Sequence, residues 1–174
     1  MPRTCLRLTL TLALTLFFCA SLVMAQTAAE LDNLLETETV TTGQAARFVM
    51  GAAGVLSPEL SGAEAETTAY EEALANRWVK SGQGEAITLQ ETAFLIMNVF
   101  QLKGGLMYSV FHNPRYAYRE MVYQRLIPGR TNNTLKISGT KFLQILGRVL
   151  NYTGEREEMD SLLRYDSIES GVVN

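Results

Sequence analysis

Residues 87–100 read ITLQETAFLIMNVF, and this stretch decides the predicted fold. Thr88 is a favourable N-cap, and Glu91 follows three positions later, as a capping box requires. Every residue from 93 to 97 is apolar, so the helix would be apolar around most of its circumference. A surface helix has a single apolar stripe. We therefore predict that this helix lies inside the protein.

Two other segments begin in the same way, VTTGQ at residues 40–44 and ISGTK at 137–141. Their starts lie 47 and 50 residues from the start of the central stretch. The upstream parts of the second and third copies also agree at a spacing of 48, in the pairs Tyr70 and Tyr118, Leu74 and Val122, Arg77 and Arg125, and Trp78 and Leu126. Repeats of this length, made of helices, indicate units that complete each other's core.

The predicted fold class is therefore all-α, with three helix-loop-helix repeat units packed into one helical domain over residues 26–154. The units span approximately residues 28–56, 69–105 and 115–151. Within them, helices are expected over 70–79, 116–126 and 137–150, with a loop over 57–68 and a break at Pro114. Residues 155–174 are expected to form an acidic C-terminal tail. Met159, Leu162 and Leu163 allow a short docking helix in it, whereas residues 167–174 have no apolar periodicity.

The first 25 residues have the pattern of a cleaved secretory signal peptide. Arg3 and Arg7 precede an uncharged stretch, and small residues allow cleavage after Ala25. One alternative is an uncleaved anchor, although 17 uncharged residues fall short of the roughly 20 that span a bilayer. A second, minor alternative is a lipid anchor on Cys19, but bulky Phe18 precedes it where lipoproteins have a small residue.

Both cysteines, Cys5 and Cys19, lie in this leader. After cleavage the chain would have no thiol for a disulfide, a metal site or a nucleophile. The predicted location is the periplasm or the cell envelope of a bacterium, or secretion. No membrane span is expected in the processed chain.

The charge balance limits the possible partners. The chain has 15 basic and 18 acidic residues, a net charge of −3, and loss of the two leader arginines would give −5. Nucleic-acid binders need a basic face that displaces counterions, so no nucleic acid is expected. The total charge also gives no reason to expect attachment to anionic lipid.

The repeats resemble S-layer homology (SLH) repeats, which occur in threes on exported bacterial envelope proteins. The match is best in AYREMVYQRLIPG at 117–129, followed by Ile137 and Ser138. The resemblance implies helix pairs joined by a glycine-containing loop and a Thr- or Ser-capped second helix. It also implies a wall-polymer site with an arginine directly after the cap. Here those positions are Thr42, Leu89 and Gly139, so the polymer site is expected to be lost or rebuilt.

We expect no catalytic, cofactor or metal residues. His112 is the single histidine, and beside Phe111 and Pro114 it fits a turn or packing role better than catalysis. The chain has no metalloprotease, calcium-loop or phosphate-loop motif. An enzyme would need a nucleophile, a base and an orienting group, and no visible motif supplies them.

The candidate binding residues are Arg115, Tyr116, Tyr118 and Arg119. Arginines beside tyrosines suit recognition of a carboxylate, a phosphate or a sugar. Arg115 and Arg119 are four residues apart and can share one helix face. The alternative is that the tyrosines pack between units while the arginines pair with the chain's excess carboxylates.

The leading functional hypothesis is an exported, non-catalytic interaction or structural module that binds another envelope protein. The first alternative is an SLH-like module that binds a wall polymer. An enzyme of unknown class and a lipid-anchored subunit are the less favoured alternatives.

Overall fold

The computed structural model describes residues 28–57, 59–129 and 131–170, with side chains as far as residue 161. The six labelled helices are α2 (Thr42–Ala52), α3 (Gly62–Ala75), α4 (Leu89–Val99), α5 (Leu106–Phe111), α6 (Pro114–Tyr123) and α7 (Gly139–Ser170). Residues 28–36 are helical too. The described residues form no strand, only two isolated bridges, so the all-α fold class is confirmed. The predicted leader, its cleavage site and Cys19 lie outside the described residues.

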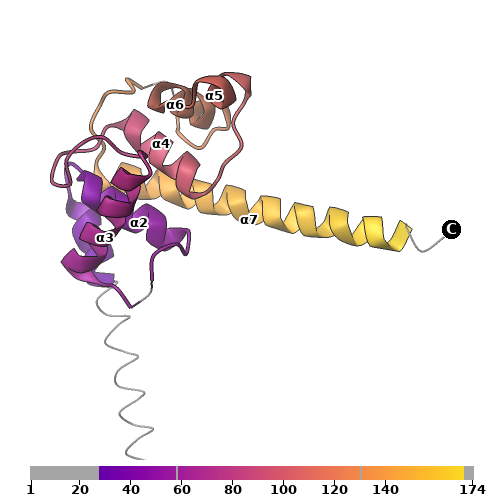
Figure 1. Cartoon of the computed structure of the whole chain (residues 1–174), viewed down its shortest axis with the longest axis horizontal. Helices are drawn as coiled ribbons and strands as arrows, with labels where there is room; N and C mark the ends of the chain where they lie inside the picture. The colour runs from indigo at the N-terminus through magenta and orange to yellow at the C-terminus, as the bar shows by residue number, and fades with distance from the viewer. Residues whose placement is uncertain (1–27, 58, 130, 171–174) are drawn as a thin grey trace, which may run out of the picture. The chain divides into compact units, whose positions relative to one another are not determined.

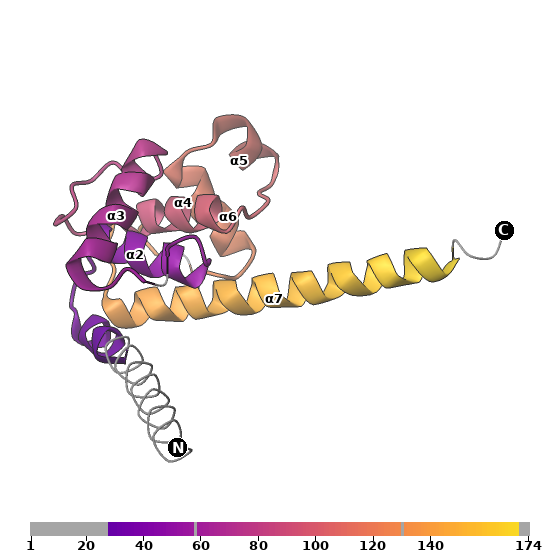
Figure 2. The same cartoon turned by 60° about the horizontal axis from the view of Figure 1, so that its bottom comes forward.

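The chain divides into two compact units after Glu36. The larger unit begins at Thr37 and contains all the labelled helices. Within it, α4 contacts α6 on one side and α2 on the other, while α3 packs on α2 and α5 on α6 (Figures 1 and 2). The central position of α4 is therefore the position predicted for the apolar stretch.

Helix α4 is buried along nearly its whole surface. Nine of its eleven residues are buried, and Gln90 and Asn98 are the two exceptions. Thr88 caps it through its side-chain oxygen, which accepts a hydrogen bond from the Glu91 N–H at 3.4 Å. The predicted burial of this helix and its start are both confirmed.

The cap of α2 is a complete capping box. The Thr41 hydroxyl accepts from the Gln44 N–H at 3.2 Å, and the Gln44 side-chain oxygen accepts from the Thr41 N–H at 3.1 Å. Two N–H groups that the first helical turn cannot satisfy are thereby paired. The T-x-x-Q pattern predicted this start correctly.

Helix α3 begins at Gly62, whereas residues 57–68 were predicted to be a loop. Ala65, Ala69 and Ala73 recur every four residues and are fully buried, and alanine and glutamate favour helix. Such small side chains allow close packing, and a Cβ on Gly43 of α2 would lie only 2.5 Å from the Glu66 carboxylate. The helix also ends earlier, at Ala75, and Arg77 adopts a left-handed conformation with φ 59°.

Pro114 begins helix α6, although the sequence suggested a break there. Asn113 is the N-cap, since its side-chain oxygen accepts from the Tyr116 N–H at 3.2 Å. Proline is favoured at the first helical position because its missing N–H would have no partner there. The helix accordingly starts two residues before the predicted start and ends at Tyr123.

Helix α7 is longer than predicted and continues through Gly154 to Ser170. The predicted tail is therefore helical over residues 155–170. The start of α7 is anchored by buried Phe142, Ile145 and Val149, while nearly all described side chains from 154 to 161 are exposed. A glycine inside a helix costs about 1 kcal/mol, which the surrounding helix-favouring residues can offset. Over the residues described, we find no helix long and apolar enough to cross a membrane.

Candidate functional site

The four candidate binding residues all lie on α6, but they do not form one cluster. Arg115 and Arg119 are exposed, Tyr116 is half-buried and Tyr118 is buried. Arg115 lines a hollow at the start of α4, together with Lys80, Glu91 and other residues. Tyr118 and Arg119 line a second hollow, beside the carboxyl-terminal half of α6. The two arginines therefore line different hollows, although they are four residues apart on the same helix.

The second hollow, which we call the α6 hollow, is lined by Tyr118, Arg119, Val122, Tyr123 and Thr131. The Tyr118 hydroxyl donates to the Thr131 carbonyl and accepts from the Thr131 N–H, the latter at 3.0 Å. This pair of hydrogen bonds fixes the loop after α6 against the helix. Tyr123 is 83% exposed, so an aromatic ring is available beside the guanidinium of Arg119.

Tyr116 connects α5 to the arginine of this hollow. Its ring stacks on that of Phe111, with centroids 5.2 Å apart and an angle of 19° between the planes. The Arg119 guanidinium carbon lies 5.9 Å from the Tyr116 ring centroid, within cation–π range. The contact restricts Arg119 and leaves its donors available to a carboxylate or phosphate.

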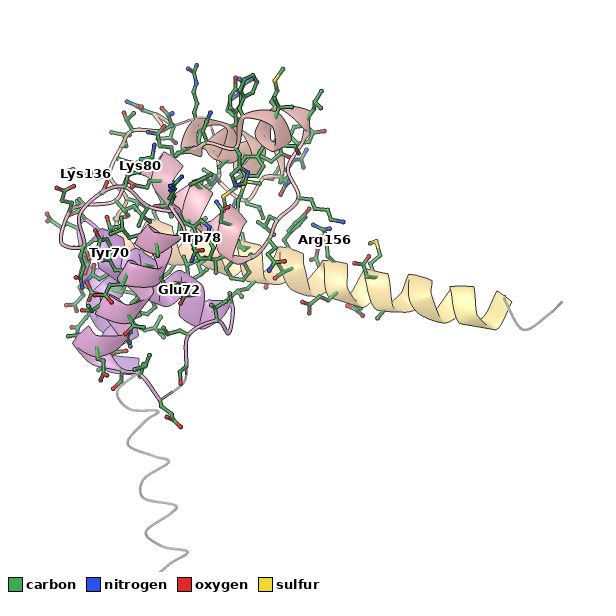
Figure 3. The ribbon with its side chains drawn as sticks, in the orientation of Figure 1. Tyr70, Glu72, Trp78, Lys80, Lys136 and Arg156 are labelled. Carbon is green, nitrogen blue, oxygen red and sulfur yellow. The ribbon has the colours of Figure 1, made fainter. Side chains whose placement is uncertain are left out.

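In the first hollow, the Glu91 carboxylate is buried and hydrogen-bonded. It accepts from the Lys80 N–H at 2.7 Å, the Ser81 N–H at 3.0 Å and the Ser81 hydroxyl at 2.8 Å. Lys80, labelled in Figure 3, follows α3 and reaches the first turn of α4 through this contact. The capping box expected at Thr88 is therefore incomplete, because the Glu91 carboxylate turns to the 80–81 loop instead. Its role is to fix the loop between two helices.

His112 lies in an aromatic packing cluster. Its ring is 5.3 Å from Phe94 and 4.9 Å from Tyr108, and its Nε2 lies 3.0 Å from the Asn98 side-chain oxygen. The Asn98 amide nitrogen donates to the Phe94 carbonyl at 2.7 Å, which leaves its oxygen to accept from the histidine. The contacts described for His112 are those of a packing residue. Among the described side chains, no group of three His, Cys, Asp or Glu residues could hold a metal ion.

Tyr108 has a buried hydroxyl, and no hydrogen-bond partner for it is found among the described residues. Burial raises the pKa of Tyr108 to about 12, and the polar interaction of its hydroxyl with the Asn98 side chain, which does not meet the geometry of a hydrogen bond, lowers it by less. The neutral phenol is therefore favoured in the folded protein. As the pH rises from about 10 toward 12, the unfolded chain loses this proton first, so folding stability falls.

Tyr108→Phe should remove both the buried hydroxyl and the dependence of folding stability on pH that comes from its raised pKa. We expect the variant to be as stable as the wild type at pH 7, or up to about 1 kcal/mol more stable, because an unpaired buried hydroxyl is lost. Its advantage should grow between pH 10 and 12. Denaturant unfolding at pH 7, 10 and 11.5 measures both effects, with the exposed Tyr123→Phe as the matched control. An advantage that shrinks with rising pH would contradict the assigned environment of Tyr108.

Sequence reasoning overlooked the exposed apolar residues of α5, namely Leu106, Met107, Val110 and Phe111. No helix was predicted between residues 105 and 115, so these apolar residues had no assigned position in the fold. The available signal was Gly104-Gly105, which separates the run from α4. Gly104 packs so closely on the Tyr108 ring that a Cβ there would clash with it.

No match was found. Comparisons with protein-family models, with curated proteins and with solved structures gave no significant hit for this chain.

Proposed function

We propose that this chain is an exported, non-catalytic interaction module of three helix-loop-helix units, and that a partner protein binds at the α6 hollow. The observation that carries the proposal is the exposed Arg119 guanidinium, held over Tyr116 at the edge of a hollow that also contains the exposed ring of Tyr123. Arginine and tyrosine are the residue types that most often dominate protein–protein binding energy.

Backbone hydrogen bonds between the cap segments support the three-unit arrangement. The residue after each cap donates to a segment that precedes another cap, in the pairs Thr42 to Glu85, Leu89 to Leu135 and Gly139 to Thr37, each at 2.9 Å. The apolar residues before the caps, Val40, Ile87 and Ile137, are buried together, and Val40 bonds both of the others. Three equivalent bonds that run in one cyclic order are expected of three similar units around a shared core.

The helix ends repeat as well. Arg77 after α3 and Arg125 after α6 have φ values of 59° and 61° and are 48 residues apart. Gly54 after α2 and Gln101 after α4 have φ values of 67° and 50° and are 47 apart. Each left-handed residue closes its helix in the same way, since its N–H bonds a carbonyl three residues earlier. The periodicity seen in the sequence thus extends to backbone conformations that the side chains did not reveal.

The choice of a protein partner over a wall polymer depends on the composition of the α6 hollow. Val122 and Tyr123 supply apolar and aromatic surface, and Arg119 supplies one cation. A polyanionic polymer would instead favour several cations on one face. The resemblance to SLH repeats implies an arginine directly after each cap, and none of the three caps has it. Arg115 lies in the other hollow, with the Glu91 carboxylate, so it does not supply the second cation. A peptide segment with one carboxylate beside apolar side chains suits the α6 hollow better.

Partner capture from the envelope fraction tests this function. We expect the wild type to retain a specific protein, and Arg119→Ala and Tyr123→Ala each to weaken its binding at least about tenfold, which corresponds to about 1.4 kcal/mol. Arg156→Ala is the matched control, because Arg156 (labelled in Figure 3) lies over Tyr152 on α7 at 5.6 Å in the same type of contact. It should leave binding unchanged.

Two outcomes would contradict the proposal. One is an equal loss of partner binding in the Arg156→Ala and Arg119→Ala variants, which would mean that the α6 hollow is not the binding site. The other is salt-sensitive sedimentation with purified wall polymer that disappears in the double variant Arg115→Ala/Arg119→Ala. That result would identify a polymer, and not a protein, as the ligand.

A further inference from the structure

Helix α5 exposes four large apolar side chains on a six-residue helix. Leu106 is 78% exposed, Met107 57%, Val110 64% and Phe111 54%. They occupy adjacent positions one turn apart, so they form one patch. Single exposed apolar residues need no explanation, but a contiguous patch of this kind marks an interaction surface.

The patch faces outward because of the way α5 is attached. Tyr108 is the buried residue of α5, and it packs against Gly104 and the His112 ring. The helix contacts α6 and lies on the side of α4 away from α2 and α3 (Figures 1 and 2). With Tyr108 inward, Leu106 and Val110 lie toward the opposite side of the helix, and Met107 and Phe111 are exposed beside them.

Charge is distributed unevenly around this patch. Residues 99–136 contain six Lys or Arg residues and one acidic residue, Glu120, whereas residues 37–98 contain eight glutamates and three basic residues. Although the whole chain has a net negative charge, the segment 99–136 is net basic, and α5 lies within it. Lys103 precedes the helix and Arg115 follows it, and both are exposed.

Cations also lie close to the patch in space. Phe111 stacks on Tyr116, and the Arg119 guanidinium lies over the same tyrosine. Glu120, the one acidic residue of the segment 99–136, accepts a hydrogen bond from the Gln124 side chain at 3.0 Å. An apolar patch with an aromatic edge and surrounding cations matches the layering of an anionic bilayer surface, which has hydrocarbon inside and phosphate outside.

We propose that α5 inserts Leu106, Met107, Val110 and Phe111 into the interfacial layer of an anionic lipid bilayer, while Lys103 and Arg119 contact the headgroups. This membrane contact goes beyond the proposed function: its apolar part is α5, and Arg119 is the one residue that it shares with the α6 hollow. A lipid surface suits the patch better than a protein does, because the patch projects from the fold and lines none of the hollows described above. A fluid bilayer requires no complementary shape, and binding to it increases with buried apolar area and with attraction to anionic lipid.

Sedimentation with lipid vesicles tests the proposal. The full protein should bind vesicles of phosphatidylcholine with phosphatidylglycerol at least about tenfold more tightly than vesicles of phosphatidylcholine alone, and added salt should weaken the binding. The double variant Leu106→Ser/Val110→Ser should bind at least about tenfold more weakly than the wild type. Both positions are exposed, so far-UV circular dichroism and the thermal midpoint should not change.

The matched control is Val55→Ser/Leu74→Ser, which removes apolar side chains that are 47% and 44% exposed in the acidic part of the chain. It should bind vesicles as the wild type does. Any contribution of the amino-terminal segment is the same in both double variants. Equal binding by the two variants, or no binding of the wild type to anionic vesicles, would overturn the proposal. Because the vesicle test changes α5 alone, its failure is distinguishable from failure of partner capture at Arg119.

A tryptophan at the patch distinguishes insertion from self-association. In the variant Trp78→Phe/Phe111→Trp the single tryptophan would report on α5, and its emission should shift to shorter wavelength when anionic vesicles are added. A blue shift that depends on protein concentration and needs no vesicles would show that a second copy of the chain covers the patch, which would overturn the membrane contact.

Discussion

Replacing Ile96 with alanine should lower the free energy of unfolding by about 2–5 kcal/mol, which is a large part of the stability of a domain of this size. Ile96 lies fully buried in the middle of α4, the helix that contacts both α2 and α6. Removing three carbon atoms there leaves a cavity that neighbours on both sides would have to fill. The loss should appear in urea unfolding as a lower midpoint with an unchanged slope.

Leu74→Ala is the matched control for this substitution. Leu74 is a leucine on a helix of similar length, but it is 44% exposed. Its truncation should change the free energy of unfolding by no more than about 0.5 kcal/mol. Equal effects of the two substitutions would mean that α4 is not the helix at the centre of the core.

Glu91→Ala should destabilise the protein by about 2–3 kcal/mol, because it leaves two backbone N–H groups and the Ser81 hydroxyl without their acceptor. Glu91→Gln keeps one side-chain oxygen and should cost about half as much. The free energy of unfolding measured in urea gives both values. The comparison tests whether the carboxylate is a structural acceptor for the 80–81 loop.

Glu85→Ala serves as the control for Glu91. The Glu85 carboxylate accepts from the Gly82 N–H at 3.2 Å in the same loop, but the residue is exposed. Water can replace that bond, so the cost should be within about 0.5 kcal/mol. A loss at Glu85 as large as at Glu91 would indicate that the whole loop is fragile and that Glu91 has no special role.

Features that depend on a few neighbouring residues could be predicted from the sequence. The starts of α2 and α4 follow from Thr41 and Thr88, whose hydroxyls bond N–H groups three residues later. The burial of α4 follows from its apolar composition, which no exposed helix would have. The helix starts and the burial of α4 could be predicted because each depends on residues that are close together in the sequence.

Features that depend on distant contacts could not be predicted in the same way. Alanines at 65, 69 and 73 gave only a weak apolar signal, yet they form the buried face of α3, a helix that packs on α2. The third capped helix was predicted to end at Leu150, but α7 continues through Gly154 to Ser170, because a glycine ends a helix only when the next residues leave the helical conformation. The direction of the Glu91 side chain was set by a loop ten residues earlier in the chain.

The candidate site shows the same division. The residue types in RYAYR at 115–119 indicated a binding segment, and helical spacing placed both arginines on one face. That spacing could not show that Tyr118 would be committed to the Thr131 loop, or that Arg115 would share a hollow with Glu91. The α5 patch was missed because apolar residues are expected inside a protein, whereas in α5 Tyr108 is buried and the other four large apolar residues are exposed.

Amide hydrogen exchange in the native state tests most directly whether the three units form one interlocked core. The N–H groups of Thr42, Leu89 and Gly139 make the three bonds between cap segments. If each unit completes the others, all three amides should exchange with the free energy of global unfolding, and Ile96→Ala should lower all three values equally. The Ser109 N–H of α5 should exchange far faster and provides the internal reference. A cap amide that exchanges at a lower free energy than the other two, and does not respond to Ile96→Ala, would contradict the interlocked arrangement.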